Sequence, residues 1–523
     1  MEGRKVRRCS VVVLTILLAF GLRMLYLQER PLWYDEAFAV LYAALSPARI
    51  IYGTVTRVGG AGAADVHPLL YYFLLHGWMR GAGQSPFAVR FLSVGLGMVT
   101  VALLGRLAAW CFDRRTGLAV GLLAAINPFH VAYSQEARMY ALLGLTAVAA
   151  AWGLLRALEE RSGICHSSFA HSPFIIRHSP FARCRWWLLY VAAAALTLYV
   201  HNLGSGVVLA LNLLAAARRQ WWRRLPVLAL ADLGVLVLFS PWLVGVLPGQ
   251  IGFVGRGYWL SPPGMQEVVR TTMLAALTFY EPAPVWVLGV GLFTGLVLLA
   301  LLTLRVWRTR SRAGWFVLLC WAPILLLLTA SRWHPVYLER ALLPSALFYV
   351  VALGWLLARG GLPRSLLLGL VALLLVTAAG SLGSHYTYVG FPRPPFQAAV
   401  DYLQARVKSA GTVIHTSKLT YFPMRVYAPD LPGGFLADPP GAPQDTLAYP
   451  TQEALGIFAT PTITEAVGEA QDVWLVYFSR EVEEVRAMGA DHPALAWLES
   501  LFALVEQERF DDLVVALYRR EGP

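Results

Sequence analysis

Long runs of apolar residues alternate with short polar segments along most of the 523-residue chain. Many of these runs contain about 18–22 uncharged residues, the length that an α-helix needs to cross a bilayer. The pattern predicts a polytopic α-helical membrane protein with about eleven spans. The predicted spans lie near residues 10–27, 87–110, 118–133, 138–157, 186–201, 204–217, 225–246, 284–304, 314–330, 338–357 and 365–383. Together they define a membrane domain over residues 1–383.

The first long connection, residues 28–86, contains two apolar helical stretches that are too short or too polar for a span. These are "DEAFAVLYAAL" at 35–45 and "HPLLYYFLLHGWMRG" at 67–81. We predict that they form interfacial helices that lie on the membrane surface. A rival assignment makes 68–82 a full span. That assignment would exchange the sides of all later connections and place the arginine-rich ones outside, so we reject it.

The pattern changes after residue 383, where a C-terminal α/β domain is predicted over residues 384–523. "FQAAVDYLQARV" has helical periodicity, and "GTVIHTS", "DVWLVYFSR" and "DDLVVALYRR" have the character of strands. The segment "LAWLESLFALVEQ" at 495–507 is amphipathic. Pro and Gly residues in 429–443 indicate a loop.

Composition supports the membrane class, because 57% of the residues are hydrophobic and 14% are charged. The net charge of +12 is unevenly divided: residues 1–383 hold 33 basic and 13 acidic residues, and the rest of the chain holds 10 and 18. Nucleic-acid binding is not predicted, because the arginines lie in short connections between apolar runs. The basic N-terminus resembles a signal peptide without a small-residue cleavage site, which predicts an uncleaved first span.

The arginines fall on one side of the predicted spans. They lie before the first span and after the second, fourth, sixth, eighth and tenth, for example Arg114, Arg115, Arg308, Arg310 and Arg359. The positive-inside rule makes this side cytoplasmic. We therefore expect an integral protein of the cytoplasmic membrane whose connection 28–86 and C-terminal domain are extracytoplasmic.

Polar residues that the spans do not explain gather on the predicted outer side. Ionisable groups near a membrane tend to line a functional cavity because their burial is costly. The candidates are Asp35, Glu36, His67, Glu136, Arg138, Tyr140, His201 and Arg340.

Simpler roles exist for several of these residues. Glu36 can serve as a helix-start residue, and Arg138 can snorkel to the interface. Arg340 can pair with Glu339, and His67 can occupy a turn before Pro68.

Three motifs carry a resemblance. "PLWYDEAFAV", then "DVHPLLYYFLLHGWMRGAGQSPFAVRFLSVGLG", then "NPFHVAYSQEARMYALLGL" resemble the bacterial protein-mannosyltransferase-like membrane glycosyltransferases of the GT-C superfamily. This family is similar to the protein O-mannosyltransferases and to the aminoarabinose transferase that modifies lipid A. The resemblance covers roughly residues 1–160 and continues more weakly through "LYVHNLG" and "HPVYLERALLPSALF".

The resemblance implies an inverting glycosyltransferase at the outer face of the membrane. It would move a sugar from a polyprenyl-phosphate donor to a protein, lipid or glycan acceptor. Asp35 matches the acidic residue that acts as general base in the family, and Glu36 is a second catalytic candidate. The motif "DVHPL" is closer to the "HPPL" of the mannosyltransferases than to the Lys-containing motif of the aminoarabinose branch, which favours mannose or a related hexose.

The physical chemistry of such a reaction agrees with these residue types. A carboxylate can take the proton of the acceptor hydroxyl, and arginines suit a leaving phosphate. The other substrate-binding candidates are His67, Glu136, Tyr140 and His201. We expect no cofactor, with a divalent metal as a weaker alternative. A polymerase or ligase of lipid-linked glycans remains a second reading and a transporter a third, although we find no paired inverted halves.

Overall fold

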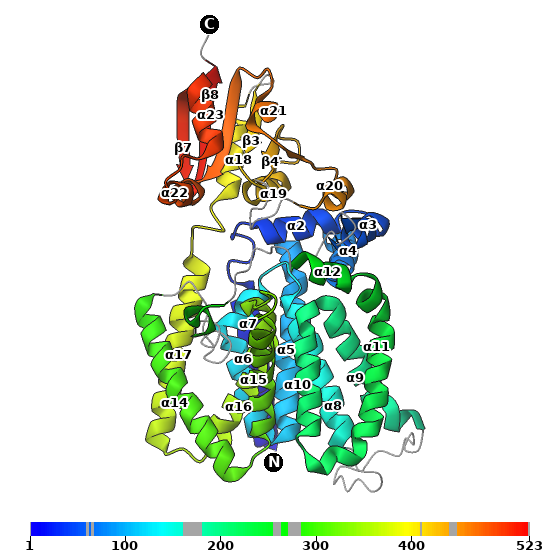
Figure 1. Ribbon diagram of the computed structural model, residues 1–523. Helices are drawn as coiled ribbons and strands as arrows, with labels where there is room; N and C mark the ends of the chain where they lie inside the picture. The colour runs from blue at the N-terminus through cyan, green and yellow to red at the C-terminus, as the bar shows by residue number, and fades with distance from the viewer. Residues whose placement is uncertain are drawn as a thin grey trace.

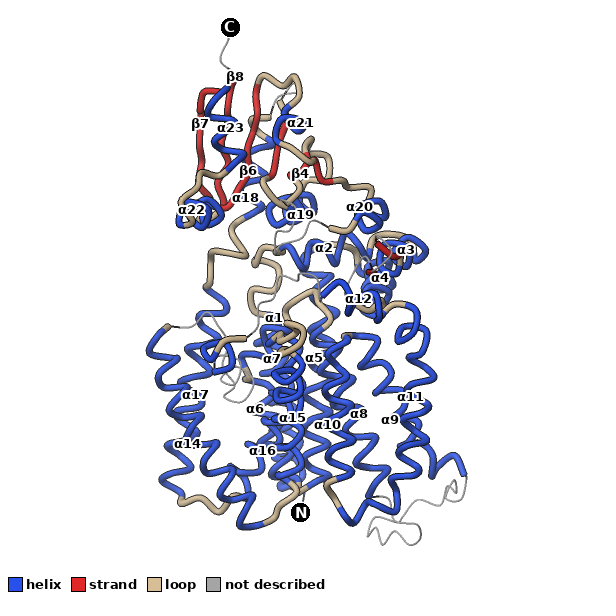
Figure 2. Tube along the Cα trace, viewed as in Figure 1, coloured by secondary structure: helices blue, strands red, loops and turns tan. Residues whose placement is uncertain are grey.

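The structure is a computed structural model that describes residues 2–58, 62–63, 67–159, 180–254, 263–269, 284–407, 411–438 and 447–520. A bundle of long helices carries a smaller domain with a β-sheet at one end (Figure 1). Figure 2 shows that the strands belong to this smaller domain, apart from a short ribbon near α3. The ribbon pairs β1 (Arg57–Val58) with β2 (Gly62–Ala63). The fold class is thus a polytopic helical domain joined to a C-terminal α/β domain.

The helical bundle follows the apolar runs of the sequence. Its elements are α1 (Glu2–Met24), α5 (Pro86–Cys111), α6 (Arg114–Ile126), α7 (Pro128–Ser134), α8 (Tyr140–Glu159), α9 (Pro180–Val200), η1 (Asn202–Gly204), α10 (Ser205–Ala216), η2 (Arg219–Arg224), α11 (Leu225–Gly245), α12 (Leu247–Val254), α14 (Val285–Thr309), α15 (Ala313–Ala330), η3 (Glu339–Leu342), α16 (Leu343–Arg359) and α17 (Arg364–Thr387).

Seven helices within the described residues are long and apolar enough to cross a membrane, and α6 with α7 forms an eighth candidate bent by 60°. Three shorter apolar helices cover Ser10–Met24, Cys184–Val200 and Asn202–Ala216. Each predicted span falls on one of these elements. The number of spans, about eleven, stays a prediction because the shorter helices do not meet the same length criterion.

Polar contacts tie several connections together at the end of the bundle away from the C-terminal domain. Arg359 pairs with Asp113, and Arg312 pairs with Glu159 at 2.6 Å. Arg305 donates to the carbonyl of Gly361 at 3.1 Å. The connections that follow α5, α8, α14 and α16 therefore share one end, as the distribution of arginines predicts.

Three short helices between α1 and α5 form a platform beneath the C-terminal domain (Figure 1). They are α2 (Tyr34–Ala43), α3 (Pro47–Val55) and α4 (Leu70–Ala82). With 13 residues, α4 is about 20 Å long and too short to cross a bilayer. The structure thus has short helices in the connection 28–86, and the rejected span over 68–82 does not form.

The C-terminal domain contains a six-stranded sheet in the order β5-β4-β3-β6-β8-β7. The strands are β3 (Thr412–His415), β4 (Gly434–Leu436), β5 (Ala459–Thr460), β6 (Asp472–Phe478), β7 (Phe502–Phe510) and β8 (Leu513–Arg520). The first four are parallel, while β8 is antiparallel to β6 and β7. The helices are α18 (Phe396–Gln404), α19 (Lys418–Tyr427), α20 (Tyr449–Leu455), α21 (Ile463–Val467), α22 (Ser479–Ala487) and α23 (Pro493–Leu501).

Helices cover both faces of this sheet, since successive strand residues point to opposite sides. On one face, Trp474 and Val476 pack with Phe396 of α18 and Met424 of α19. On the other face, Leu475 packs with residues of α21 and α23. The amphipathic segment 495–507 is divided between α23 and β7, because its second half pairs with β8. Two of the helices, α19 and α20, contact α2 and α3 of the platform.

Candidate active site

Asp35 lies in the first turn of α2, where the helix dipole favours a negative charge. Its Oδ2 accepts a hydrogen bond from Arg340 Nη1 at 2.6 Å and lies 3.7 Å from Arg138 Nη2. The side chain keeps 19% of its surface exposed. Burial by itself raises the pKa of Asp35, but the charges of Arg138 and Arg340 outweigh this effect and hold the pKa below its ordinary value. Asp35 is therefore an ionised carboxylate that a ligand can still reach.

Glu36 has no exposed surface, and both of its oxygens are occupied. Arg90 donates from Nε at 2.8 Å and from Nη2 at 2.7 Å. Arg393 Nη1 donates at 2.7 Å, and the backbone N–H of Ala137 at 2.9 Å. Burial raises the pKa of Glu36, but Arg90 and Arg393 lower it to about 2 overall. With four donors already bound, Glu36 has a positioning role in our proposal, in place of the catalytic role that we expected for it.

Arg90 of α5 is a site residue that our sequence reasoning missed. Besides Glu36 it binds the carbonyls of Leu27, Arg30 and Pro31 at 2.9, 2.7 and 3.0 Å. It therefore fixes the chain that leads into α2. An arginine within a predicted span was the available signal, because such a residue usually faces a polar partner. Arg393, also missed, lies outside any motif and gave no such signal.

The connection between α7 and α8 contacts the start of α2. Arg138 Nη1 donates to the carbonyl of Asp35 at 3.2 Å, and Glu136 Oε1 accepts the indole N–H of Trp33 at 2.9 Å. Burial and the nearby charge of Glu36 raise the pKa of Glu136, against the opposing effect of Arg393. Both residues therefore act on the same turn of helix that carries Asp35.

His67, His201 and Tyr140 form a neighbouring group of rings. The ring of His201 lies 5.9 Å from that of His67 and 6.1 Å from that of Tyr140. Nδ1 of His201 accepts the backbone N–H of Leu203 at 3.1 Å, so Nε2 carries the proton of the neutral ring. Nε2 is buried and lacks a hydrogen-bond partner among the described residues, which leaves it available to a substrate oxygen.

The structure thus gathers all eight predicted residues near the junction of α2 with the bundle. Seven charged residues form what we call the Asp35 cluster: Asp35, Glu36, Glu136, Arg90, Arg138, Arg340 and Arg393. Four arginines face three carboxylates, so the cluster has an excess of positive charge when all are ionised. Such a site can hold an anionic group such as a phosphate while keeping one carboxylate accessible.

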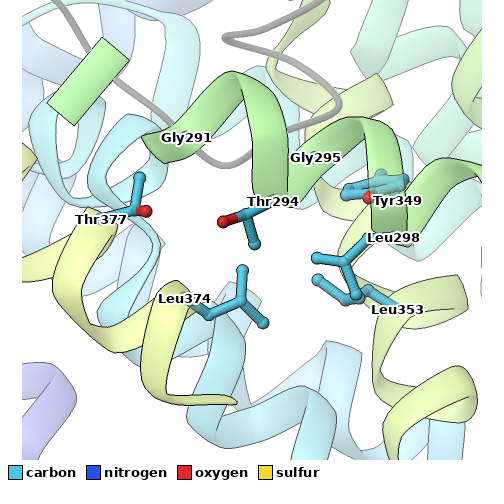
Figure 3. A pocket seen from close by; sticks show the side chains of 8 residues that line it. All are labelled: Gly291, Thr294, Gly295, Leu298, Tyr349, Leu353, Leu374 and Thr377. Atoms are coloured by element: carbon cyan, nitrogen blue, oxygen red, sulfur yellow. The ribbon is translucent and has the colours of Figure 1, made fainter. Parts of the chain in front are cut away.

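Two further observations set the limits of this site. A narrow crevice with no room for a water molecule lies between α14, α16 and α17, and none of the eight candidates lines it (Figure 3). Its lining is mainly apolar and includes Thr294, Tyr349 and Thr377. Among the described residues, no group of three His, Cys, Asp or Glu side chains could hold a metal ion.

Comparison with solved structures shows that this chain shares its fold with ArnT and with the oligosaccharyltransferase AglB. A family model described as dolichyl-phosphate-mannose-protein mannosyltransferase matches residues 66–170, about a fifth of the chain. No curated protein sequence gives a significant match. The GT-C-like fold predicted from the sequence is confirmed.

Particular solved structures match over nearly the whole chain. ArnT from Cupriavidus metallidurans bound to undecaprenyl phosphate has a TM-score of 0.62 at 14% identity, and the match covers 97% of each chain. The same enzyme in the apo state has a TM-score of 0.59 at 14% identity, with 99% and 98% covered. The oligosaccharyltransferase AglB from Archaeoglobus fulgidus, in complex with an inhibitory peptide and a dolichol-phosphate, has a TM-score of 0.52 at 12% identity. That match covers 99% of this chain and 74% of AglB.

Proposed function

We propose that this protein is an inverting glycosyltransferase that moves a sugar from a polyprenyl-phosphate donor to an acceptor hydroxyl. The observation that carries the proposal is the environment of Asp35, a partly exposed carboxylate bound by Arg340 and approached by Arg138. One group can take a proton and two can hold a phosphate, which are the roles that this reaction requires.

The donor would place its phosphate against Arg138 and Arg340. Arginine binds phosphate through its forked N–H donors, and the excess positive charge of the Asp35 cluster favours an anion. The matched ArnT structure is bound to undecaprenyl phosphate, which supports a lipid of this class. The mannosyltransferase family match and the "DVHPL" motif support mannose or a related hexose.

The transfer would proceed as a single displacement. The acceptor oxygen attacks the anomeric carbon while Asp35 takes the hydroxyl proton. The bond between that carbon and the phosphate oxygen breaks, and its electron pair leaves with the lipid phosphate, which Arg138 and Arg340 stabilise. Attack from the face opposite the leaving group inverts the anomeric carbon.

Binding of the donor would also tune the base. In the free protein the two arginines hold the pKa of Asp35 low, and a weakly basic carboxylate is a poor proton acceptor. A bound phosphate would compensate their charge, so the pKa of Asp35 would rise once the donor is in place. The base would then become effective only in the donor complex.

Our proposal places this reaction at the outer face of the cytoplasmic membrane. The arginine-bearing connections share the end of the bundle away from the C-terminal domain, as shown by the contacts of Asp113, Glu159 and Gly361. The positive-inside rule would make that end cytoplasmic. Asp35 and the C-terminal domain would then lie outside, where a protein, lipid or glycan acceptor would be available.

The test is transfer of radiolabel from a panel of polyprenyl-phosphate sugars in membranes, comparing the wild type with Asp35→Asn. We expect transfer by the wild type from at least one donor and at least a 100-fold loss in Asp35→Asn, since a positioned base contributes about 10²–10⁴-fold. Transfer by Asp35→Asn at the wild-type rate would remove the base from the mechanism. Transfer only from lipid-linked oligosaccharides would favour the ligase reading.

A further inference from the structure

The linker between α17 and α18 makes a tight turn that belongs to the C-terminal domain. The backbone N–H of Arg393 donates to the carbonyl of Gly390 at 2.6 Å, and Gly390 has a φ of 125° that favours glycine. The ring of Phe391 packs edge-on against Phe478 of β6 at 5.2 Å. Phe396, directly after the linker, is fully buried in the domain core. Arg393 is therefore anchored to the sheet of this domain.

From this turn, the side chain of Arg393 reaches into the Asp35 cluster with only 9% of the residue's surface exposed. Its Nη1 donates to Glu36 Oε2 at 2.7 Å and to the carbonyl of Pro31 at 3.2 Å. Its Nη2 lies 3.8 Å from Glu136 Oε1. The guanidinium also lies over the indole of Trp33, 5.5 Å from the ring centre. One side chain thus joins two buried carboxylates to the chain just before Asp35.

Trp33 links these contacts to the reactive group. It is the N-cap residue of α2, two positions before Asp35. Its indole N–H binds Glu136, and the guanidinium of Arg340, the partner of Asp35, lies 5.1 Å from its ring centre. Without Arg393, Glu36 and Glu136 would face each other with one cation fewer between them, at a cost that favours rearrangement.

The C-terminal domain also contacts the other residues that lead to Asp35. The hydroxyl of Tyr427 accepts the backbone N–H of Leu32 at 2.9 Å, and Phe422 packs edge-on against Tyr34 at 5.8 Å. Pro31, Leu32, Trp33 and Tyr34 are therefore all in contact with Arg393 or α19. These four residues immediately precede Asp35, so the position of α2's first turn depends on the docked domain.

We infer that Arg393 is a positioning residue for Asp35, acting through Trp33 and Glu36, and that the C-terminal domain is thereby a working part of the active site. The inference rests on the proposed function only in naming Asp35 as the base. Its structural content is that the first turn of α2 is ordered by a residue of the other domain. An acceptor that moved this domain would move the base with it.

The experiment compares Arg393→Gln, Arg393→Lys and Trp33→Phe with Arg486→Gln, an exposed arginine on α22 of the same domain. Full-length proteins are purified in detergent, and donor KM, kcat and hydrogen–deuterium exchange of residues 32–43 are measured. In Arg393→Gln we expect kcat to fall roughly 10- to 100-fold with donor KM within about 3-fold, since small misplacements of a catalytic group cost about this much. Arg393→Lys should retain an intermediate rate because it keeps the charge but not the fork.

The exchange measurement does not depend on transfer, so it separates this inference from the proposed function. We expect amides in the first turn of α2 to exchange at least about 10-fold faster in Arg393→Gln and unchanged in Arg486→Gln. If Arg393→Gln does not fold, Trp33→Phe provides the test instead, because it removes the indole N–H that binds Glu136. We expect its amides in the first turn of α2 to exchange faster than those of the wild type. Wild-type kcat together with wild-type exchange in the folded variants would overturn the inference. Loss of protein yield with normal kcat per folded molecule would reduce Arg393 to a stabilising contact.

Discussion

At the scale of single residues, two adjacent carboxylates have opposite environments. Glu36 accepts four hydrogen bonds and has no exposed surface. Asp35 is bound on Oδ2 and remains 19% exposed. The sequence alone left Glu36 between a catalytic and a helix-start role. Only the resemblance distinguished Asp35, as the general base, from Glu36. The two roles follow from the hydrogen-bond partners: the oxygens of Glu36 are all occupied, which suits a positioning role, whereas Asp35 can still accept a proton.

The first prediction concerns the pH dependence of transfer. The pKa of Asp35 lies below 3.8 in the free protein because Arg138 and Arg340 stabilise its charge, so the ionised base is lost only as pH falls through that lowered value. The acid limb of kcat/KM reports the free protein and should lie below pH 3.8, whereas the limb of kcat should lie higher because the donor phosphate compensates the arginines. Arg340→Gln should raise the acid limb of kcat/KM. If the acid limbs of kcat and kcat/KM fall at the same pH in the wild type, the donor phosphate does not raise the pKa of Asp35, and this part of the proposal is wrong.

A second prediction concerns stability. Glu36→Gln removes a buried charge that faces Arg90 and Arg393 and places an amide N–H donor against their N–H donors. Breaking a buried pair by changing one partner costs about 3–5 kcal/mol, so we expect a clear fall in the unfolding temperature of the purified protein. Glu483→Gln, on an exposed position of α22, is the matched control and should change little. Equal unfolding temperatures for both variants would show that Glu36 does not order the site.

The lowered pKa of Glu36 also predicts how the stability of the folded protein varies with pH. The pKa of Glu36 is about 2 in the folded protein against an ordinary value of 4.5. A group with a depressed folded pKa stabilises the fold above its unfolded pKa and loses this contribution as pH falls toward the folded value. The wild type should therefore lose stability between about pH 4.5 and pH 2, with a weaker slope in Glu36→Gln. Thermal unfolding over this range checks the difference, and parallel slopes would contradict it.

At the scale of elements, the short helices α2 and α3 connect the bundle to the C-terminal domain. Sequence patterning predicted helices in the connection 28–86 because their apolar stretches are too short to cross a bilayer. It could not predict what covers them, since the partners of α2 and α3 lie in α19 and α20, far along the chain. Arg393 illustrates the same difficulty, because it lies 357 positions from Glu36 and shares no pattern with it.

A fourth prediction addresses the contact between α3 and α20. Gly53 is buried, and a Cβ there would lie 2.6 Å from the Tyr42 hydroxyl and 2.7 Å from Ala454 Cβ. Its carbonyl also accepts the hydroxyl hydrogen of Thr451 at 2.8 Å. Gly53→Ala should therefore push α20 away and cost about 1–3 kcal/mol, as overpacking does.

The measurement for this contact is protease susceptibility of the C-terminal domain in the full-length protein. Gly77→Ala is the matched control, because Gly77 lies in helix α4 with nothing within 4 Å of an added Cβ. We expect faster cleavage in Gly53→Ala and unchanged cleavage in Gly77→Ala. Equal cleavage rates in the two variants would show that the contact between α3 and α20 does not hold the C-terminal domain in place.

At the scale of the whole molecule, apolar run length and strand periodicity predicted the class of fold. The runs near 87–110 and 138–157 correspond closely to α5 and α8, and "DDLVVALYRR" corresponds to β8. Short-range patterns could not show that β7 begins inside an amphipathic segment, because pairing with β8 decides it. They also could not show that all eight candidate residues meet, since helix packing brings Asp35 to Arg340 across 305 positions.

The last prediction concerns how the whole molecule lies in the membrane. Arginines concentrate at the end of the bundle away from Asp35, and our proposal, following the positive-inside rule, takes that end as cytoplasmic. In a cysteine-free background, Arg308→Cys near the end of α14 should react with a membrane-impermeant maleimide only after the membrane is permeabilised. Glu483→Cys on α22 should react in intact spheroplasts. The reverse pattern would place Asp35 at the cytoplasmic face and contradict transfer outside the membrane. Because both sites are exposed, a difference in reactivity would report the side of the membrane and not burial within the protein.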